Sequence, residues 1–372
     1  MKNIYVAATG QHIGKTTSTL GIVANLQKMG YNTGYCKPVG QRYLSVDGKI
    51  ADKDAVLFAK VIGFDVVPEW HSPVVLASGA TRDFLDRPET FDYPGDIQRA
   101  ANHLEPNFDV MVYEGTGHPG VGGVVNLSNA DVAKMLDAGV VMVVEGGIGK
   151  TIDRLIMSIA LFREKKLPLL GVIVNKVIPE KHDQVSKYVG RKLEQMGIPL
   201  LGVVPFDRTL SFPIMETVND AVGGKVVFNG HRLNNRVEDI MAGSLVDLDE
   251  FSAFRNILLV VSHKRLKEAI EKVKEIAKLK KLDRTPLSGV IVTGDGKQEN
   301  WFKLETMEHP YFIRNEIPVL TTTLDTYGSV VKVSRIEVKI NTRTPWKIKR
   351  AITLIREHVD FGLMMDNLKK LE

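Results

Sequence analysis

A short run near the amino terminus combines the residue types that hold phosphate groups. Residues 8–17 read Ala-Thr-Gly-Gln-His-Ile-Gly-Lys-Thr-Thr and follow an apolar segment. Small residues in such a run let backbone N–H groups point at an anion, Lys15 can reach terminal phosphates, and the Thr16 hydroxyl can hold Mg²⁺. The spacing departs from G-x-x-x-x-G-K-[ST], because Thr9 stands at the first glycine position and Gly10 follows it. We interpret the run as a variant phosphate-binding loop, with an ordinary strand-to-helix turn as the alternative. The loop residues predicted to bind a nucleotide are Gly10, Gln11, His12, Ile13, Gly14, Lys15, Thr16 and Thr17.

Two acidic residues are candidates for binding the metal ion that accompanies phosphate groups. Glu114 directly follows the apolar run 109–113, and Asp54 lies in the first turn of a predicted helix. Together with the Thr16 hydroxyl they would offer oxygen ligands to Mg²⁺, completed by phosphate oxygens and water. The alternatives are a turn or helix-capping carboxylate for Glu114 and a plain helix-start acid for Asp54.

Lys37 ends a predicted strand, where a cation would lie beside the phosphate tail. It could bind a carboxylate or stabilise the charge that develops during phosphoryl transfer. An exposed lysine at a strand end is the alternative.

A second glycine-rich run, residues 145–151, resembles the first but has Val144 and Glu145 where glycine would be expected. We interpret it as an anion-binding nest at a helix start, with an ordinary tight turn as the alternative. The residues that could hold a substrate carboxylate there are Gly149, Lys150, Thr151 and Ile152.

The elements around these residues alternate as in a doubly wound α/β domain with a mostly parallel sheet. Strands are predicted at 3–8, 32–39, 109–113, 140–144, 170–174 and 199–204, and helices at 16–29, 51–60, 95–104, 152–165 and 181–196. A polar loop is expected up to residue 50, and a loop or lid across 68–94. The candidate residues fall at the carboxyl ends of strands, where such domains bind ligands. This domain is expected to span residues 1–215.

A second, smaller α/β domain is expected over residues 216–330. Its predicted elements are a helix at 264–278 and strands at 287–293 and 317–321. Residues 331–372 are expected to add a strand and a closing helix, 344–359, that pack on this second domain.

Composition narrows the class of protein. With 44% hydrophobic and 25% charged residues, the 372-residue chain has an ordinary globular composition, and no apolar run approaches the roughly 20 residues of a membrane span. The start is too short for a secretory signal, and the single Cys36 favours a reducing, cytoplasmic setting. The net charge is +5, but basic and acidic residues are interspersed, so neither a nucleic-acid nor a membrane partner is expected.

Five segments together resemble a known family. Residues 9–17, Lys37-Pro38-Val39, Asp54-Ala55, Glu114-Gly115-Thr116-Gly117 and Gly171-Val172-Ile173-Val174-Asn175 look in this order like dethiobiotin synthetase. They are most similar to the dethiobiotin synthetase-like ATPase domain that also begins long phosphate acetyltransferases. The resemblance covers about 215 residues, and its motifs are specific as a set rather than singly.

The resemblance implies ATP and Mg²⁺ as cofactors and a role for each matching residue. Lys15 and Thr16 would bind phosphate and Mg²⁺, Asp54 and Glu114 would join the metal site, and Asn175 would read adenine. Lys37 would aid carbamate formation and phosphorylation. In dethiobiotin synthetase the loop that matches 149–152 binds a substrate carboxylate across a dimer, so a homodimer is expected, with Thr116 among the substrate residues.

The second domain is similar to the DRTGG domain that follows in those acetyltransferases. Residues 323–327, Thr-Leu-Asp-Thr-Tyr, resemble its closing element. Such domains are associated with dimerisation and regulatory nucleotide sensing. Acetyl transfer from CoA is not expected, because the sequence stops before an acetyltransferase catalytic domain.

Two functions of different kinds remain open. The first is an ATP-dependent enzyme that hydrolyses ATP or phosphorylates a small carboxylate or carbamate facing Lys37. The alternative is a nucleotide-sensing module that regulates a partner metabolic enzyme. A DNA-partitioning ATPase is disfavoured, because the loop lacks the early lysine of that class.

Overall fold

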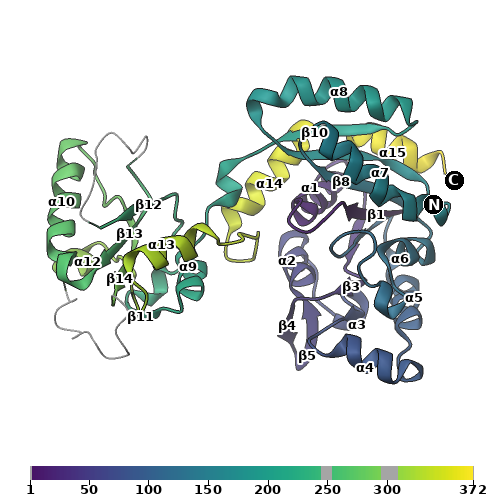
Figure 1. Ribbon diagram of the computed structural model, residues 1–372. Helices are drawn as coiled ribbons and strands as arrows, with labels where there is room; N and C mark the ends of the chain where they lie inside the picture. Colours follow the sequence, from purple (N-terminus) through teal and green to yellow (C-terminus); the bar gives the residue numbers. More distant parts are fainter. Residues whose placement is uncertain (1, 244–253, 295–308, 372) are drawn as a thin grey trace. The chain divides into compact units, whose positions relative to one another are not determined.

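The computed structural model describes residues 2–243, 254–294 and 309–371 (Figure 1). The chain divides into two compact units. The first combines Met1–Asp207 with Ile340–Glu372, and the second is Arg208–Lys339. The boundary therefore follows Asp207, several residues before the expected position at 215.

The first unit is built on a six-stranded sheet in the order β10-β9-β8-β1-β7-β2, in which all neighbouring strands are parallel. Its strands are β1 (Asn3–Ala8), β2 (Thr33–Cys36), β7 (Val110–Glu114), β8 (Ala138–Glu145), β9 (Leu169–Val177) and β10 (Leu200–Pro205). Strands β1, β2 and β7 are buried at every position, as expected for apolar runs in a parallel sheet that is covered on both faces. The predicted α/β class with a mostly parallel sheet is confirmed.

The first unit also contains ten helices within its described residues. They are α1 (Lys15–Lys28), α2 (Lys53–Ile62), α3 (Pro68–His71), α4 (Ala80–Asp86), α5 (Tyr93–Leu104), α6 (Asn129–Met135), α7 (Gly149–Glu164), α8 (His182–Gln195), α14 (Pro345–His358) and α15 (Phe361–Lys369). Short strands β3 (Val39–Gly40) and β6 (Val74–Val75) pair with each other. Helices α3 and α4 and strand β6 occupy the region 68–94, where a loop or lid was expected.

A hairpin replaces the polar loop expected before residue 50. Strands β4 (Tyr43–Val46) and β5 (Lys49–Asp52) pair antiparallel, with Val46 opposite Lys49. The two-residue connection is Asp47-Gly48, and both residues have positive φ, 48° and 78°. An Asp-Gly pair suits this kind of tight turn, because both central positions need a left-handed backbone. The expectation of a loop was wrong because it overlooked this turn signal.

The carboxyl-terminal helices correct another expectation, since residues from 340 onward belong to the first unit and not to the second. Helix α14 lies against α1: a Cβ atom on Gly21 would come within 2.3 Å of the Ile355 Cβ, and Asn25 Nδ2 donates to the Ile352 carbonyl at 3.2 Å (Figure 1). Helix α1 is buried throughout residues 18–26, so it needs cover on the side away from the sheet. Helix α14 supplies that cover.

The second unit has a five-stranded sheet in the order β11-β15-β14-β13-β12. Strand β11 is antiparallel to β15, and the other pairs are parallel. The described elements are α9 (Met215–Val222), β11 (Lys225–Phe228), β12 (Asp239–Ala242), β13 (Ile257–Ser262), α10 (Leu266–Leu279), β14 (Leu287–Thr293), α12 (Pro310–Arg314), β15 (Val319–Thr322) and α13 (Thr326–Ser334). The predicted second α/β domain is thus present. Across the described ranges of both units, no helix has the length and apolar character needed to cross a membrane.

Candidate functional site

The predicted phosphate loop joins β1 to α1 at the carboxyl edge of the sheet. Gly14, the residue before α1, has φ 98°, a left-handed conformation that favours glycine. Packing also requires glycine here, because a Cβ atom at this position would lie 2.0 Å from Asn175 Nδ2. The loop therefore requires its second glycine for backbone conformation and for packing.

The amino end of α1 can accept an anion. The first turn of a helix leaves its N–H groups without intrahelical partners, and the first backbone bond into α1 runs from Ser18 N to Gly14 O at 2.9 Å. Within the described part of the chain, the N–H groups of Gly14, Thr16 and Thr17 donate to no backbone carbonyl. Lys15 Nζ donates to the Gly117 carbonyl at 3.2 Å. These groups fit a bound phosphate chain.

Four predicted residues from four parts of the chain meet beside this loop. Thr16 lies in α1, and Glu114 ends β7. The Thr16 Oγ1 donates to Glu114 Oε1 at 2.8 Å. Lys37 Nζ, just after β2, lies 3.2 Å from Glu114 Oε1 and 3.0 Å from Asp54 Oδ2 in α2. The structure thus brings these four side chains, two from strand ends and two from helices, together beside the loop.

Lys37 is buried, with 4% of its surface exposed, so the alternative of an exposed strand-end lysine is wrong. Its ammonium also donates to the Gly115 carbonyl at 3.0 Å. Burial alone would lower the pKa of Lys37, but the carboxylates of Glu114, Asp54 and Asp52 raise it well above its ordinary value. Lys37 therefore carries a fixed positive charge at the site.

Tyr35 is a site residue that the sequence analysis missed. Its hydroxyl donates to Glu114 Oε2 at 3.2 Å, and its ring stacks on Phe58 with centroids 3.6 Å apart. Burial raises the pKa of the Tyr35 phenol, so it stays protonated and able to donate. The signal was available, because Tyr35 precedes Lys37 by two positions and strand residues at this spacing share a face.

Asp52 explains why Asp54 is available to the site. Asp52 caps α2 by accepting from the Asp54 N–H at 2.9 Å, and it also accepts from the N–H groups of Gln41 and Arg42. The capping role thus falls on Asp52, and the Asp54 carboxylate turns toward Lys37. The alternative of a plain helix-start acid does not account for this contact.

The residues present fit Mg²⁺ bound together with phosphate. Hydroxyl and carboxylate oxygens are ligands that Mg²⁺ prefers, and Thr16 and Glu114 already lie within 2.8 Å of each other. In the described ranges, no three His, Cys, Asp or Glu side chains form a metal cage. A site with one hydroxyl and two carboxylates would therefore depend on phosphate oxygens and water, as Mg²⁺ sites in nucleotide-binding proteins do.

Thr116, predicted to contact substrate, is held inside the protein. Its hydroxyl donates to the Val39 carbonyl, and its N–H donates to Asn129 Oδ1 at 2.9 Å. Asn129 also accepts from the Tyr5 hydroxyl at 2.8 Å and donates to the carbonyls of Thr116 and His118. This network shapes the segment after β7, and no sequence signal pointed to Asn129.

The second glycine-rich run lies after β8, at the same edge of the sheet. Helix α7 begins at Gly149, and Lys150 is exposed. The Thr151 hydroxyl donates to the Glu145 carbonyl at 2.7 Å, and Ile152 is buried in the core. A substrate role for these residues remains a prediction. A substrate would meet the exposed Gly149 and Lys150 at the amino end of α7, because the side chains of Thr151 and Ile152 are buried.

Asn175, predicted to read adenine, contacts the phosphate loop. Its Nδ2 donates to the Ile13 carbonyl at 2.9 Å, and its Oδ1 accepts from the Lys176 N–H at 2.9 Å. The side chain is buried, with 5% exposed. The role in base recognition remains a prediction.

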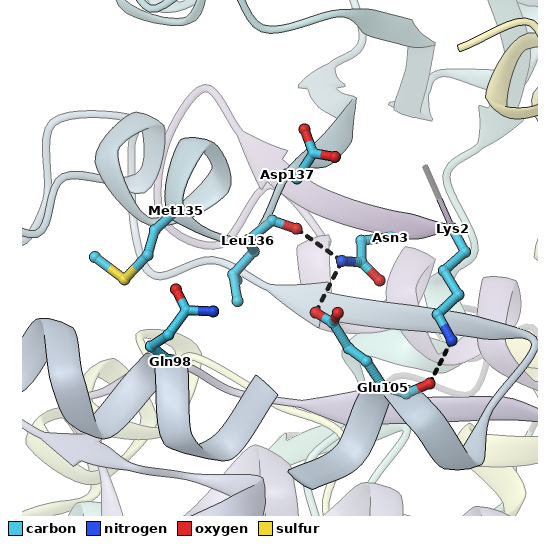
Figure 2. A pocket seen from close by; sticks show the side chains of 7 residues that line it. All are labelled: Lys2, Asn3, Gln98, Glu105, Met135, Leu136 and Asp137. Atoms are coloured by element: carbon cyan, nitrogen blue, oxygen red, sulfur yellow. Dashed lines mark hydrogen bonds between the residues drawn. The ribbon is translucent and has the colours of Figure 1, made fainter. Parts of the chain in front are cut away.

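A separate hollow of about 350 Å³ lies at the opposite, amino-terminal edge of the sheet (Figure 2). Asn3 Nδ2 donates there to Glu105 Oε1 at 2.8 Å and to the Leu136 carbonyl at 2.7 Å. None of the predicted site residues lines it. The hollow is therefore distinct from the candidate site.

Comparison with known proteins gives relatives of several kinds, including phosphate acetyltransferases and a dethiobiotin synthetase. The chain is 24% identical over 375 residues to a phosphate acetyltransferase of Nitrosomonas europaea, covering 98% of this chain and 51% of that protein. It is 24% identical over 217 residues to an ATP-dependent dethiobiotin synthetase of Clostridium acetobutylicum, covering 55% of this chain and 87% of that protein. The chain thus spans about half the length of the curated phosphate acetyltransferases that it matches.

A solved structure and a family profile each match more than half of the chain. Cobyrinic acid a,c-diamide synthase from Mycobacterium smegmatis, with bound ADP and magnesium, aligns with 56% of this chain and 88% of that one, at 14% identity and a TM-score of 0.37. The profile of the AAA_26 family, described as an AAA domain, matches residues 2–213. Because that match includes more than half of the 372 residues, the chain belongs to this family of P-loop domains.

Proposed function

We propose that this protein binds MgATP in the loop 8–17 and transfers the γ-phosphoryl group, either to water or to a small carboxylate or carbamate. The observation that carries the proposal is the meeting of Thr16, Glu114, Lys37 and Asp54 within 2.8–3.2 Å contacts beside the loop. A hydroxyl, two carboxylates and a buried cation next to a helix amino end are the groups that phosphoryl transfer requires.

The loop would hold the phosphate chain. The N–H groups at the start of α1 would donate to phosphate oxygens, and the Lys15 ammonium would leave the Gly117 carbonyl for the terminal phosphates. Positioning of this kind supplies much of the catalysis in phosphoryl transfer, because the reaction needs little covalent participation by the protein.

Thr16, Glu114 and Asp54 would hold the metal ion. When bound, Mg²⁺ would neutralise the negative charge of the phosphate oxygens. Tyr35 would keep Glu114 oriented by its hydrogen bond to the second carboxylate oxygen. The carboxylates of Asp54 and Glu114, which contact the Lys37 ammonium, would then contact both that ammonium and the Mg²⁺ ion.

Lys37 would face the acceptor. Its charge is secured by its carboxylate neighbours, so it can bind an anionic acceptor and stabilise the oxygens of the group in transfer. The acceptor class is supported by the likeness to a dethiobiotin synthetase, 87% of whose length aligns with this chain. Thr116, Gly149, Lys150, Thr151 and Ile152 remain the proposed substrate residues, and Asn175 the proposed adenine contact.

An ATPase assay with a panel of amino and carboxylic acids, with and without bicarbonate, tests the enzyme. One compound should stimulate phosphate release from MgATP in the wild type, and the stimulation should be lost in Lys37→Gln. Calorimetry should show MgATP binding by the wild type and by Lys28→Ala, a change on the exposed end of α1, and about 100-fold weaker binding by Lys15→Ala. No binding by the wild type, or equal binding by all three, contradicts the proposal.

Regulatory nucleotide sensing is the second candidate, favoured by one observation. The chain leaves the first unit after Asp207, forms the second unit, and returns as α14 to pack on α1, the helix that begins at the phosphate loop. Nucleotide occupancy could thereby reach a DRTGG-like second domain, a homodimer or a partner enzyme. Tight MgATP binding with no stimulation by any acid would favour this function over the first.

A further inference from the structure

The hollow of about 350 Å³ lies at the amino-terminal edge of the first sheet, where strands β1 and β8 begin (Figure 2). Asn3, the first residue of β1, lies opposite Ala138, the first residue of β8, in a parallel pair. The residues just before β8 therefore join Asn3 at this edge. Helices α5 and α6 and the turn that follows α5 complete the lining. The seven lining residues are Lys2, Asn3, Gln98, Glu105, Met135, Leu136 and Asp137.

The Asn3 side chain brings a buried acceptor to this hollow. Asn3 is 5% exposed, and its Nδ2 donates to Glu105 Oε1 at 2.8 Å and to the Leu136 carbonyl at 2.7 Å. Both contacts need a donor, so the amide is fixed with Oδ1 turned away from the Leu136 carbonyl, toward the side that Lys2 lines (Figure 2). Among the residues that the structure describes, none donates to this oxygen. A buried acceptor without a donor costs free energy, so a bound molecule that donates to it would be stabilised.

Carboxylates outnumber cations around the hollow. Asp137 is exposed and Glu105 is half-buried, and neither carboxylate forms an ion pair within the described ranges of the chain. Lys2 is the single basic residue in the lining, and its ammonium donates to the carbonyls of Glu105 and Phe108. The excess of negative charge favours a cation as the bound molecule.

The size and lining of the hollow favour an organic cation over a metal ion. A volume of about 350 Å³ is in the range of sites for small molecules. In the described part of the chain, no three His, Cys, Asp or Glu side chains are grouped to hold a metal ion. Met135 and Leu136 add apolar surface to the lining. An alkylammonium ion suits these features, because its N–H groups only donate and its carbon chain is apolar.

We propose that this hollow binds a small aliphatic amine in its ammonium form. The ammonium group would donate to Asn3 Oδ1 and to the Glu105 carboxylate, with the negative charge of Asp137 nearby. The carbon chain would pack on Met135 and Leu136. The proposal goes beyond the proposed function and does not depend on it, because the hollow lies at the edge of the sheet opposite to the phosphate loop.

The test compares a cation with its neutral analogue. Ligand-observed NMR at low ionic strength would measure the binding of butylammonium and of butan-1-ol to the full chain. Butylammonium should bind the wild type with a Kd on the order of 1 mM, and butan-1-ol about tenfold more weakly, since it carries no charge. Glu105→Gln and Asp137→Asn, which keep side-chain shape but remove charge, should each weaken butylammonium binding by about fivefold. Lys2→Gln should strengthen it by about threefold, because a like charge is removed.

The controls separate the outcomes. Asp183→Asn, at an exposed position of α8, makes the same chemical change as Asp137→Asn and should leave butylammonium binding unchanged. Equal losses in these two variants, or equal binding of the amine and the alcohol, would overturn the proposal. The absence of any amine binding by the wild type would mean that the hollow holds only water, with the same result. Weaker amine binding by Lys2→Gln would also contradict a cation site. Should Glu105→Gln fail to fold by circular dichroism, Asp137→Asn and Lys2→Gln decide, because their expected effects are opposite in direction.

Discussion

The tripeptide Gly-Lys-Thr occurs twice at the carboxyl edge of the first sheet, and its two copies are built differently. In the first copy, left-handed Gly14 precedes α1, and the Thr16 hydroxyl donates to Glu114 on a neighbouring strand. In the second copy, Gly149 is itself the first residue of α7, and the Thr151 hydroxyl donates to the carbonyl of Glu145, the last residue of the preceding strand β8. The same three residue types therefore form a polar centre in one place and close a turn in the other.

Neighbouring strands account for this difference. The first copy faces β7, which ends in Glu114, and β2, after which Lys37 follows. In the second copy, the Thr151 hydroxyl donates to the nearby Glu145 carbonyl, and Lys150 is exposed to solvent. A Gly-Lys-Thr run thus takes part in a polar centre only where other strand ends deliver its charged partners, as at Thr16 and Glu114.

Replacing Lys15 and Lys150 in turn should give the largest difference in MgATP affinity between the two copies. Lys15→Ala is expected to lower MgATP affinity about 100-fold, because a hydrogen bond to a charged phosphate contributes roughly 1.5–3 kcal/mol. Lys150→Ala is expected to keep MgATP affinity within about threefold of the wild type. Titration calorimetry on both variants measures the two effects. Equal losses would mean that both loops bind the nucleotide, and the distinction drawn between them would be lost.

Adding a methyl group at each glycine tests the backbone difference. Gly14→Ala should lower the free energy of unfolding by about 2 kcal/mol, because φ 98° is costly for alanine and the new Cβ would meet Asn175. Gly149→Ala should stay within about 0.5 kcal/mol of the wild type, since no atom lies within 4 Å of its Cβ position. Urea unfolding followed by circular dichroism gives both values. A larger cost at Gly149 than at Gly14 would reverse the structural contrast.

Removing the hydroxyl groups of Thr16 and Thr151 should give the smallest effects, each confined to one property. Thr16→Val is expected to raise the Mg²⁺ concentration needed for half-maximal ATP binding by about tenfold, since the proposed metal site would lose one ligand. Thr151→Val should instead cost about 1 kcal/mol of folding stability through the lost bond to Glu145, with no change in the Mg²⁺ requirement. ATP binding across a Mg²⁺ series, with EDTA as the zero point, separates the outcomes. An unchanged Mg²⁺ requirement in Thr16→Val would remove Thr16 from the metal site.

Much of the site could be predicted from the sequence, because its parts follow local patterns. The loop 8–17 stands between an apolar strand and a helix, and Lys37 and Glu114 each follow a strand of the same sheet. Parallel strands place their carboxyl ends at one edge, so residues at those ends approach one another without further information. Asp54 was also predicted, although its availability depends on the cap supplied by Asp52.

Other features could not be predicted because no local pattern encodes them. Asn129 reaches the segment after β7 through a side chain that belongs to α6. The contact of Lys176 with His12 depends on the left-handed backbone of Lys176. The hairpin at 43–52 is a different case, since its Asp-Gly turn was present in the sequence and was overlooked.

The amino-acid sequence by itself determined the α/β class, the phosphate loop and the strand ends that carry its charged partners, because apolar periodicity and turn residues act over short distances along the chain. Only the tertiary structure decided which side chains hold the loop and what covers α1. Helix α14 reaches α1 through a contact between Asn25 and Ile352, 327 positions apart. The apolar residues of a helix indicate from its sequence that it will be buried. Contacts between distant segments depend instead on how their side chains fit together, and this fit leaves no periodic pattern in the sequence.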